Sequence, residues 1–331
     1  MARERDDRRN ARPVNSSVCG ADNSALRGTG IMIQCRRLGH ITVQTPDLDR
    51  MVEYYQEILG LRVAASTATD AYLVTRVGQI ALHLQKGATT RCTRVSFQIA
   101  PKVQIAELQA KLKSVGVESD LRSDAVPGIT QTLSFTDPAG TALDLFVTAD
   151  FLPRAGSTGV APMKAHHAAF VVSDPKRLAQ FYSELLGFRV SDWVADLFVF
   201  MRCGPDHHTV NFLTGKQTRI HHLAFEMRDS AHLIESCELL GLRKIPIIWG
   251  PVRHGPGHNL ATYHIAPDGL VVELFCEMDR MVDEELGYFE PRPWHDELPQ
   301  RPKVWPSGGS RDVWGPPSPP DFINAGVSQT S

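Results

Sequence analysis

The sequence predicts an α+β protein made of four βαβββ-like modules, which pair into two similar domains. The main reason is an internal repeat: residues 40–63 and 167–190 align over 24 positions without a gap. Each copy opens on His, and Asp, Arg, Tyr, Glu, Leu, Gly and Val recur at the same offsets. A weaker repeat follows each copy, beginning at Arg94 and at His222. Self-similarity of this kind indicates a duplicated structural unit.

Each copy of the stronger repeat reads as a strand, a helix and the start of a second strand. Asp47 and Asp174 stand at the expected helix starts. A short acidic side chain there accepts the unpaired backbone N–H groups of the first turn. Gly60 and Gly187 follow the amphipathic stretch, at a position where glycine typically ends a helix.

Each copy of the weaker repeat begins with a strand, Arg94-Val-Ser-Phe or His222-Leu-Ala-Phe, and continues through a helix. A closing hairpin follows, with the turn sequence Asp-Pro-Ala-Gly at 137–140 or Ala-Pro-Asp-Gly at 266–269. The last strands carry one carboxylate each, Asp144 and Glu273. Two modules therefore form each domain.

The domain boundaries follow from composition. The ranges we predict are a disordered N-terminal extension at 1–34, a first domain at 35–152, a linker at 153–163, a second domain at 164–290, and a Pro-rich C-terminal arm and tail at 291–331. The extension is polar and poor in aromatic residues, which favours disorder. The linker is rich in Pro, Gly and Ser. The arm is expected to be extended, with a loose terminus.

Bulk composition narrows the class of function. A net charge of −2 and a pI near 6.7 give no reason to expect a nucleic-acid partner or an anionic membrane surface. No apolar run reaches the roughly 18–20 residues of a membrane span. The six cysteines are scattered without CxxC spacing, which favours reduced thiols and a cytoplasmic location.

Superposing the repeats brings three chemistry-bearing residues of the second domain to matching positions: His167, His222 and Glu273. Two neutral imidazoles and one carboxylate form the facial triad suited to non-haem Fe(II) or Mn(II), with three coordination positions left open. Glu273 lies in an apolar strand, where a carboxylate is costly to bury without a cation. The alternative for Glu273 is an edge-strand residue that faces solvent.

The matching positions of the first domain hold His40, Arg94 and Asp144. Arg94 cannot be a metal ligand, because its guanidinium stays protonated and offers no lone pair. We therefore expect the first domain to be metal-free, with Arg94 pairing with Asp144 and His40 packed in the core.

Three histidine doublets occur in the second domain, at 166–167, 207–208 and 221–222. Strand side chains alternate between faces, so one histidine of each pair is expected to point inward. The offsets within the repeat select His167 and His222. His166 and His221 are then expected either to face outward or to lie beside the ligands.

On these residues the second domain resembles the type I extradiol ring-cleavage dioxygenases of the vicinal-oxygen-chelate superfamily, and the resemblance covers about residues 36–305. It implies that the iron ligands are His167, His222 and Glu273. It further implies three catalytic residues: His208 as acid/base, His254 beside the site, and Tyr263 next to the substrate oxygen. The arm at 293–305 is similar to the tail of some of these enzymes. The long N-terminal extension and the Gly-Pro-Gly after His254 depart from the pattern.

What the resemblance implies is a curved mixed sheet around a cavity in each domain and a mononuclear Fe(II) cofactor, with Mn(II) as the other candidate. The partners would be a catecholic substrate and O2, and the product a yellow, ring-opened muconic semialdehyde-type compound. A homo-oligomer is also expected. His258 and His264 are expected to be structural.

Two other functions remain open from the sequence. The first is another metalloenzyme of the same superfamily, such as a glyoxalase-like isomerase or an oxoacid-dependent dioxygenase, which would leave His208, His254 and Tyr263 without a role. The second is a non-enzymatic small-molecule binding or resistance protein, which would need no metal triad and would leave a buried Glu273 unexplained.

Overall fold

The computed structural model describes residues 12–13, 33–152, 158–308 and 311–329. Most of the predicted N-terminal extension and part of the linker lie outside these ranges. Within the extension, Ile33 is buried and its backbone N–H donates to the carbonyl of Leu185. Among the described residues, no helix is long and apolar enough to cross a membrane.

Four βαβββ modules form the body of the protein, as the repeats predict. The first comprises β2 (Cys35–Thr45), α1 (Leu48–Glu57), β3 (Arg62–Ser66), β4 (Asp70–Val74) and β5 (Ile80–Lys86). The second comprises β6 (Arg91–Ile99), α2 (Ile105–Ser114), β7 (Asp120–Val126), β8 (Ile129–Thr136) and β9 (Ala142–Phe146).

The second domain repeats this order. Its first module comprises β10 (Lys164–Val172), α3 (Pro175–Glu184), β11 (Arg189–Val194), β12 (Phe198–Arg202) and β13 (Val210–Thr214). Its second module comprises β14 (Arg219–Glu226), α4 (Ser230–Leu242), β15 (Ile247–Arg253), β16 (Leu260–Ile265) and β17 (Val271–Cys276).

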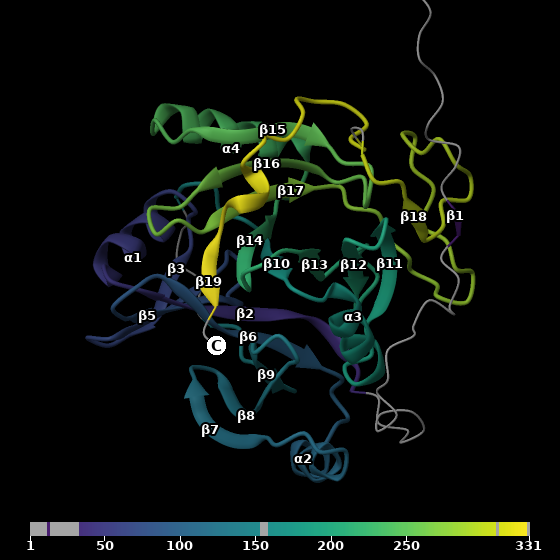
Figure 1. The fold of residues 1–331 in the computed structure, drawn as a ribbon. Helices are drawn as coiled ribbons and strands as arrows, with labels where there is room; N and C mark the ends of the chain where they lie inside the picture. Colours follow the sequence, from purple (N-terminus) through teal and green to yellow (C-terminus); the bar gives the residue numbers. More distant parts are fainter. Residues whose placement is uncertain (1–11, 14–32, 153–157, 309–310, 330–331) are drawn as a thin grey trace, which may run out of the picture.

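Both domains have the same mixed sheet. The strand order is β3-β4-β5-β2-β6-β9-β8-β7 in the first and β11-β12-β13-β10-β14-β17-β16-β15 in the second. The two modules meet in an antiparallel pair at the centre, β2 with β6 or β10 with β14. Each helix packs on strands of its own module, and α2 and α4 lie at opposite edges of the molecule (Figure 1).

The repeated residues form the helix ends that the sequence predicts. The carboxylate of Asp47 accepts from the N–H of Arg50, and that of Asp174 accepts from the N–H of Arg177. Gly60 has a φ of +69° after α1, and Gly187 has a φ of +73° after α3. Such angles suit glycine, which has no Cβ to clash in the left-handed region.

The C-terminal segment folds back on the body instead of ending loosely. It contributes β18 (Lys303–Trp305), the 3-10 helix η2 (Phe322–Asn324) and β19 (Val327–Gln329). β18 pairs with β11 and with the short strand β1 (Arg12–Pro13). β19 pairs with β14 of the second domain and β6 of the first (Figure 1). The expectation of a loose terminus is therefore wrong up to residue 329. Residues 327–329 hydrogen-bond to backbone groups of β14 and β6 that the neighbouring strands leave unpaired.

Candidate metal centre

Strand register brings three side chains to one face of the second sheet. His167 on β10 pairs with Ala224 on β14, and Ala224 pairs with Glu273 on β17. His222 precedes Ala224 by two residues on β14, so its side chain points to the same face. Residues separated by up to 106 positions in the chain therefore become neighbours.

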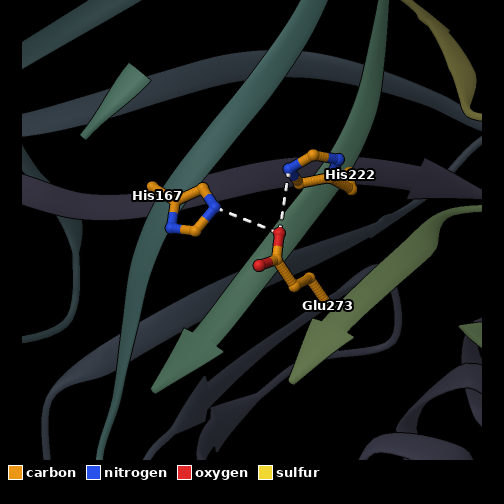
Figure 2. Close-up of side chains that lie close together, drawn as sticks. All are labelled: His167, His222 and Glu273. Atoms are coloured by element: carbon orange, nitrogen blue, oxygen red, sulfur yellow. Dashed lines mark hydrogen bonds and ion pairs between the residues drawn. The ribbon is translucent and has the colours of Figure 1, made fainter. Parts of the chain in front are cut away.

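The three side chains converge on a single oxygen (Figure 2). Nε2 of His167 lies 3.1 Å from Oε2 of Glu273, and Nε2 of His222 lies 3.1 Å from the same atom. Their exposed fractions are 0%, 7% and 1% for His167, His222 and Glu273. Glu273 therefore does not face solvent, and the edge-strand alternative is wrong.

The electrostatics of this group favour a bound cation. Burial opposes ionisation of Glu273, but the imidazoles of His167 and His222 outweigh it and lower its pKa to about 2. Burial lowers the pKa of both histidines. Nε2 of His222 is buried and has no hydrogen-bond partner among the described residues. Two imidazoles and one carboxylate, one imidazole nitrogen being buried without a hydrogen-bond partner, fit the ligand set of a divalent first-row transition metal.

A second buried group of metal-ligand types lies nearby but has a different geometry. Nδ1 of His258 lies 2.7 Å from one oxygen of Asp279, and Nε2 of His295 lies 2.9 Å from the other. Each oxygen of Asp279 thus accepts from one imidazole, whereas Nδ1 of His295 has no hydrogen-bond partner among the described residues. The bridge ties the loop before β16 to the C-terminal arm, so His258 is structural.

The first domain carries an ion pair where the second has the triad. Nη1 of Arg94 lies 2.7 Å from Oδ1 of Asp144, as the sequence predicts. Ser134 Oγ donates to the same carboxylate. His40 is buried, with Nε2 3.1 Å from Ser96 Oγ. The guanidinium supplies the positive charge that a metal would supply in the second domain.

His208 lies against the triad. Its ring centroid is 4.3 Å from that of His167, and it lines the same cavity. Burial, reinforced by the imidazoles of His167 and His207, holds the pKa of His208 well below its ordinary value of 6.5. His208 is therefore neutral near pH 7 and able to accept a proton.

Tyr263 and His254 form a hydrogen-bonded chain that ends in the tail. Nε2 of His254 lies 2.8 Å from the Tyr263 hydroxyl, and its Nδ1 lies 2.9 Å from Oδ1 of Asp312. A carboxylate can only accept, so Nδ1 of His254 carries the proton and Nε2 accepts from Tyr263. Burial raises the pKa of Tyr263 well above 10, and the nearby Glu273 adds to the effect.

Three residues of this site escape sequence reasoning. Asn259 donates to Oε1 of Glu273 at 3.0 Å and so orients the carboxylate. Trp249 stacks on Tyr263 at a centroid distance of 5.0 Å. Asp312 reaches the site from a Pro-rich tail. Repeat offsets carry no signal for them, because Trp249 lies in β15, Asn259 in the loop before β16, and Asp312 in the tail.

The triad lines a cavity of about 600 Å³ together with His208, His254 and Tyr263. The tail contributes residues 317–320 together with Phe322 and Ile323 to its lining. Apolar side chains of Val194, Phe198 and Phe200 also line it. This volume is typical of a small-molecule site.

The Gly-Pro-Gly after His254 shapes the inner edge of this cavity. Gly257 has a φ of +77°, and a Cβ there would lie 3.0 Å from Nδ1 of His207. Only glycine allows the loop to lie this close to the histidine. Pro256 lines the cavity beside it.

Three of the histidines that the sequence predicts to be structural or outward-facing are buried. His166 and His221 are 6% and 4% exposed, and each contacts its neighbouring ligand through Nδ1. Of the two placements expected for them, the one beside the ligands is therefore what the structure shows. His264 is fully buried, and its Nε2 lies 2.6 Å from the Tyr54 hydroxyl of the first domain.

The chain matches a known protein family over most of both domains. The model of the Glyoxalase/Bleomycin resistance protein/Dioxygenase superfamily matches residues 37–145 and 164–274. The two matched ranges coincide with the two domains.

Relatives with similar length were also found. Biphenyl-2,3-diol 1,2-dioxygenase of Paraburkholderia xenovorans is 26% identical over 302 residues, covering 84% of this chain and 96% of the relative. Manganese-dependent 2,3-dihydroxybiphenyl 1,2-dioxygenase of Geobacillus genomosp. 3 is 22% identical, with coverages of 81% and 93%. Homoprotocatechuate 2,3-dioxygenase of Brevibacterium fuscum has a similar fold, with a TM-score of 0.77, 22% identity and coverages of 90% and 94%.

Proposed function

This chain belongs to the glyoxalase/bleomycin resistance protein/dioxygenase superfamily, among its type I extradiol dioxygenases, and we propose that it opens the ring of a catecholic substrate with O2. Cleavage falls next to the two hydroxyls, and the product is a yellow, ring-opened muconic semialdehyde-type compound. The observation that carries the proposal is the convergence of His167, His222 and Glu273 in a cavity that also holds His208 and Tyr263.

We assign Fe(II) to the triad, with Mn(II) as the other candidate, because the same donor set accepts both metals. When bound, the metal supplies Lewis acidity that lowers the pKa of a coordinated hydroxyl, and open positions for substrate and dioxygen. His167, His222 and Glu273 hold it, and Asn259 fixes the orientation of the carboxylate.

Tyr263 positions the substrate. Its hydroxyl proton is directed to Nε2 of His254, so the lone pairs of the tyrosine oxygen remain for a hydroxyl of the catechol. Asp312 holds His254 in the required tautomer through Nδ1. A buried, correctly oriented acceptor lowers the entropic cost of aligning the ring.

His208 moves the proton. Its Nδ1 lies 3.0 Å from Nδ1 of His207, which leaves Nε2 available to the cavity. A neutral imidazole accepts a proton at Nε2 from the second hydroxyl and later returns it to the oxygen atom that leaves as the ring opens. Both atoms of O2 enter the product, so no external reductant is required.

The cavity walls select a substituted ring. A volume of about 600 Å³ exceeds the space that a bare catechol fills, and the side chains of Val194, Phe198 and Phe200 line part of it. The tail residues 317–320 line the cavity, and with a substrate bound they would help to keep water from the reacting atoms.

The test is anaerobic loading with Fe(II), followed by exposure to air with catechol, 2,3-dihydroxybiphenyl and 3,4-dihydroxyphenylacetate. We expect a yellow product and O2 uptake in a one-to-one ratio with at least one substrate. The matched control is His222→Ala, which should lose the metal and the activity together. A protein that keeps one iron per chain yet consumes no O2 with any catechol would overturn the proposal in favour of an isomerase or oxoacid-dependent reaction. A chain that binds no metal would favour a binding protein.

A further inference from the structure

His167, His208 and His222 each have a histidine immediately before them in the chain. The Nδ1 atoms of the two rings lie 3.2 Å apart in the pair 166–167, 3.0 Å in the pair 207–208 and 2.8 Å in the pair 221–222. The ring planes are close to perpendicular, at 90°, 89° and 82°. The same contact therefore occurs three times around one centre.

Local backbone irregularity makes two of these contacts feasible. In a regular strand, consecutive side chains point to opposite faces. The register between β10 and β14 shifts between Ala165 and His167, so His166 is an extra residue on β10. It shifts again where Ala169 pairs with His222 and Phe170 pairs with Ile220, so His221 is the extra residue on β14. Bulges of this kind re-aim a side chain.

The outer histidine of the 221–222 pair has one defined proton. Its Nε2 lies 2.7 Å from the backbone carbonyl of Phe322, which can only accept a hydrogen bond. His221 therefore carries its proton on Nε2, and its Nδ1 offers a lone pair. At 2.8 Å the facing Nδ1 of His222 must be the donor, because two lone pairs or two protons would repel. Nε2 of His222 then presents a lone pair towards Glu273.

The 166–167 pair follows the same logic with a carboxylate as the outer acceptor. Nε2 of His166 lies 2.9 Å from Oδ2 of Asp206, a side chain that Lys164 and Arg280 also contact. His166 thus donates through Nε2 and accepts through Nδ1 from His167. Nε2 of His167 presents its lone pair to the same oxygen of Glu273.

In the third pair the outer contact is longer. Nε2 of His207 lies 3.3 Å from Oδ2 of Asp192 but makes no hydrogen bond among the described residues. Both side chains are fully buried, and the carboxylate charge favours the proton on Nε2. Accepting at Nδ1 of His207 would leave His208 with its proton on Nδ1 and a lone pair on Nε2. That is the state in which His208 can take a proton from a substrate.

We propose that His166, His207 and His221 are positioning residues that fix the tautomers of His167, His208 and His222. The 166–167 and 221–222 pairs set two lone pairs and a carboxylate oxygen against one another, which is favourable when a cation lies between them. The 207–208 pair prepares the acid/base residue. The inference rests on the proposed metal site, but its main readout is metal affinity and not dioxygenase turnover.

The experiment compares two substitutions at each outer position. His221→Phe keeps an aromatic ring without an acceptor, whereas His221→Asn keeps an oxygen acceptor near the position of Nδ1. His166→Phe and His166→Asn form the second set. Mn(II) affinity is measured by the EPR signal of free Mn(II) during titration. We expect the Phe variants to bind about 10–100-fold more weakly, and the Asn variants to bind close to wild type.

The third position behaves differently if the inference holds. His207→Phe should bind Mn(II) like wild type and lose turnover of the Fe(II) enzyme with a catechol, and His207→Asn should recover it. His264→Phe is the control, since this fully buried histidine contacts Tyr54 and no ligand. It should leave Mn(II) affinity unchanged.

Equal affinity in the Phe variants and wild type would overturn the inference, and so would equal losses in the Phe and Asn variants, which would indicate packing alone. Long-range 1H–15N NMR of the wild-type protein tests the same point without a variant. It should show the proton on Nδ1 of residues 167, 208 and 222 and on Nε2 of residues 166, 207 and 221; the reverse assignment overturns the inference. If the affinity pattern holds while no catechol is cleaved, only the proposed reaction fails.

Discussion

At the scale of single residues, the site depends on which atom carries a proton. Oε2 of Glu273 is 3.1 Å from two imidazole nitrogens, and Oε1 accepts from Asn259. Both oxygens of the Glu273 carboxylate therefore have polar side-chain neighbours. His208 differs from His167 and His222 because Glu273 holds those two, while His208 faces the cavity without a carboxylate contact. The proposed function accordingly assigns two of these histidines to a metal and one to proton transfer.

Replacing His208 should separate these roles. His208→Phe removes the proton acceptor but keeps the ring, so metal content and catechol binding should be retained. General acid–base catalysis contributes about 10²–10⁴-fold, and we expect kcat to fall by that order. The measurement is kcat at saturating catechol together with iron content.

The control for this variant is His232→Phe. His232 is a buried histidine whose Nε2 contacts the carbonyl of Val160, away from the cavity. It should keep wild-type kcat. An unchanged kcat in His208→Phe would remove His208 from the mechanism.

At the scale of elements, the tail decides how closed the site is. Trp249 Nε1 donates to the carbonyl of Pro316 at 2.9 Å. Arg219 donates to the carbonyl of Ile323 at 2.6 Å and to that of Ala325 at 3.1 Å. These contacts hold the ends of the stretch that lines the cavity. The tail is therefore part of the active site and not an appendage.

Removing the Arg219 contacts should loosen η2. Hydrogen bonds from a charged donor contribute about 1.5–3 kcal/mol, so Arg219→Leu should lower the local opening free energy by about 2 kcal/mol. Because each 1.4 kcal/mol corresponds to tenfold, thermolysin should cut at Phe322 or Ile323 roughly 30-fold faster.

A matched control is Arg228→Leu. Arg228 is exposed and its ion pair is with the adjacent Asp229, so the cleavage rate should not change. Equal rates in Arg219→Leu and wild type would show that η2 is held by other contacts.

At the scale of the whole molecule, each domain contacts the other through a helix that meets a hairpin of its neighbour. The Tyr182 hydroxyl on α3 donates to Oδ2 of Asp137 in the first domain at 3.2 Å. The Tyr54 hydroxyl on α1 lies 2.6 Å from Nε2 of His264 in the second. β19 adds a further link by pairing with β14 and β6. The first domain thus supports the domain that carries the His167, His222 and Glu273 group.

Asp137 makes the stability of this interface depend on pH. Burial raises the pKa of Asp137 from 3.8 to about 6. This effect outweighs the hydrogen bonds from backbone N–H groups, which lower the pKa. Because the folded pKa lies above the unfolded one, stability from the protonated group is complete below about pH 4 and is lost as pH rises to about 6. The loss amounts to about 3 kcal/mol, at 1.36 kcal/mol per unit.

Asp137→Asn should remove this dependence, since the amide stays neutral and still has groups for the backbone N–H donors and Tyr182. In urea titrations from pH 4 to 7, wild type should lose stability relative to the variant up to about pH 6 and then run parallel to it. Asp49→Asn, at an exposed helix position, controls for the removal of a surface charge. A constant difference at all pH values would contradict the prediction.

The sequence alone determined the module order and the metal ligands. The repeat offsets give the caps at Asp47 and Asp174 and select His167 and His222, because both depend on residue type and local period. The pairing of Arg94 with Asp144 also follows, since a guanidinium cannot replace a metal ligand but can neutralise a carboxylate.

Only the tertiary structure decided what surrounds those ligands. The bulges that turn His166 and His221 inward depend on the register between β10 and β14. Asp312 reaches His254 across 58 positions, and the carbonyl of Phe322 reaches His221 across 101. Such contacts leave no local period in the chain. They form because the folded domains offer the tail unpaired strand ends on β14 and β6 and an apolar cavity lining. The tail's own sequence does not indicate where these partners lie.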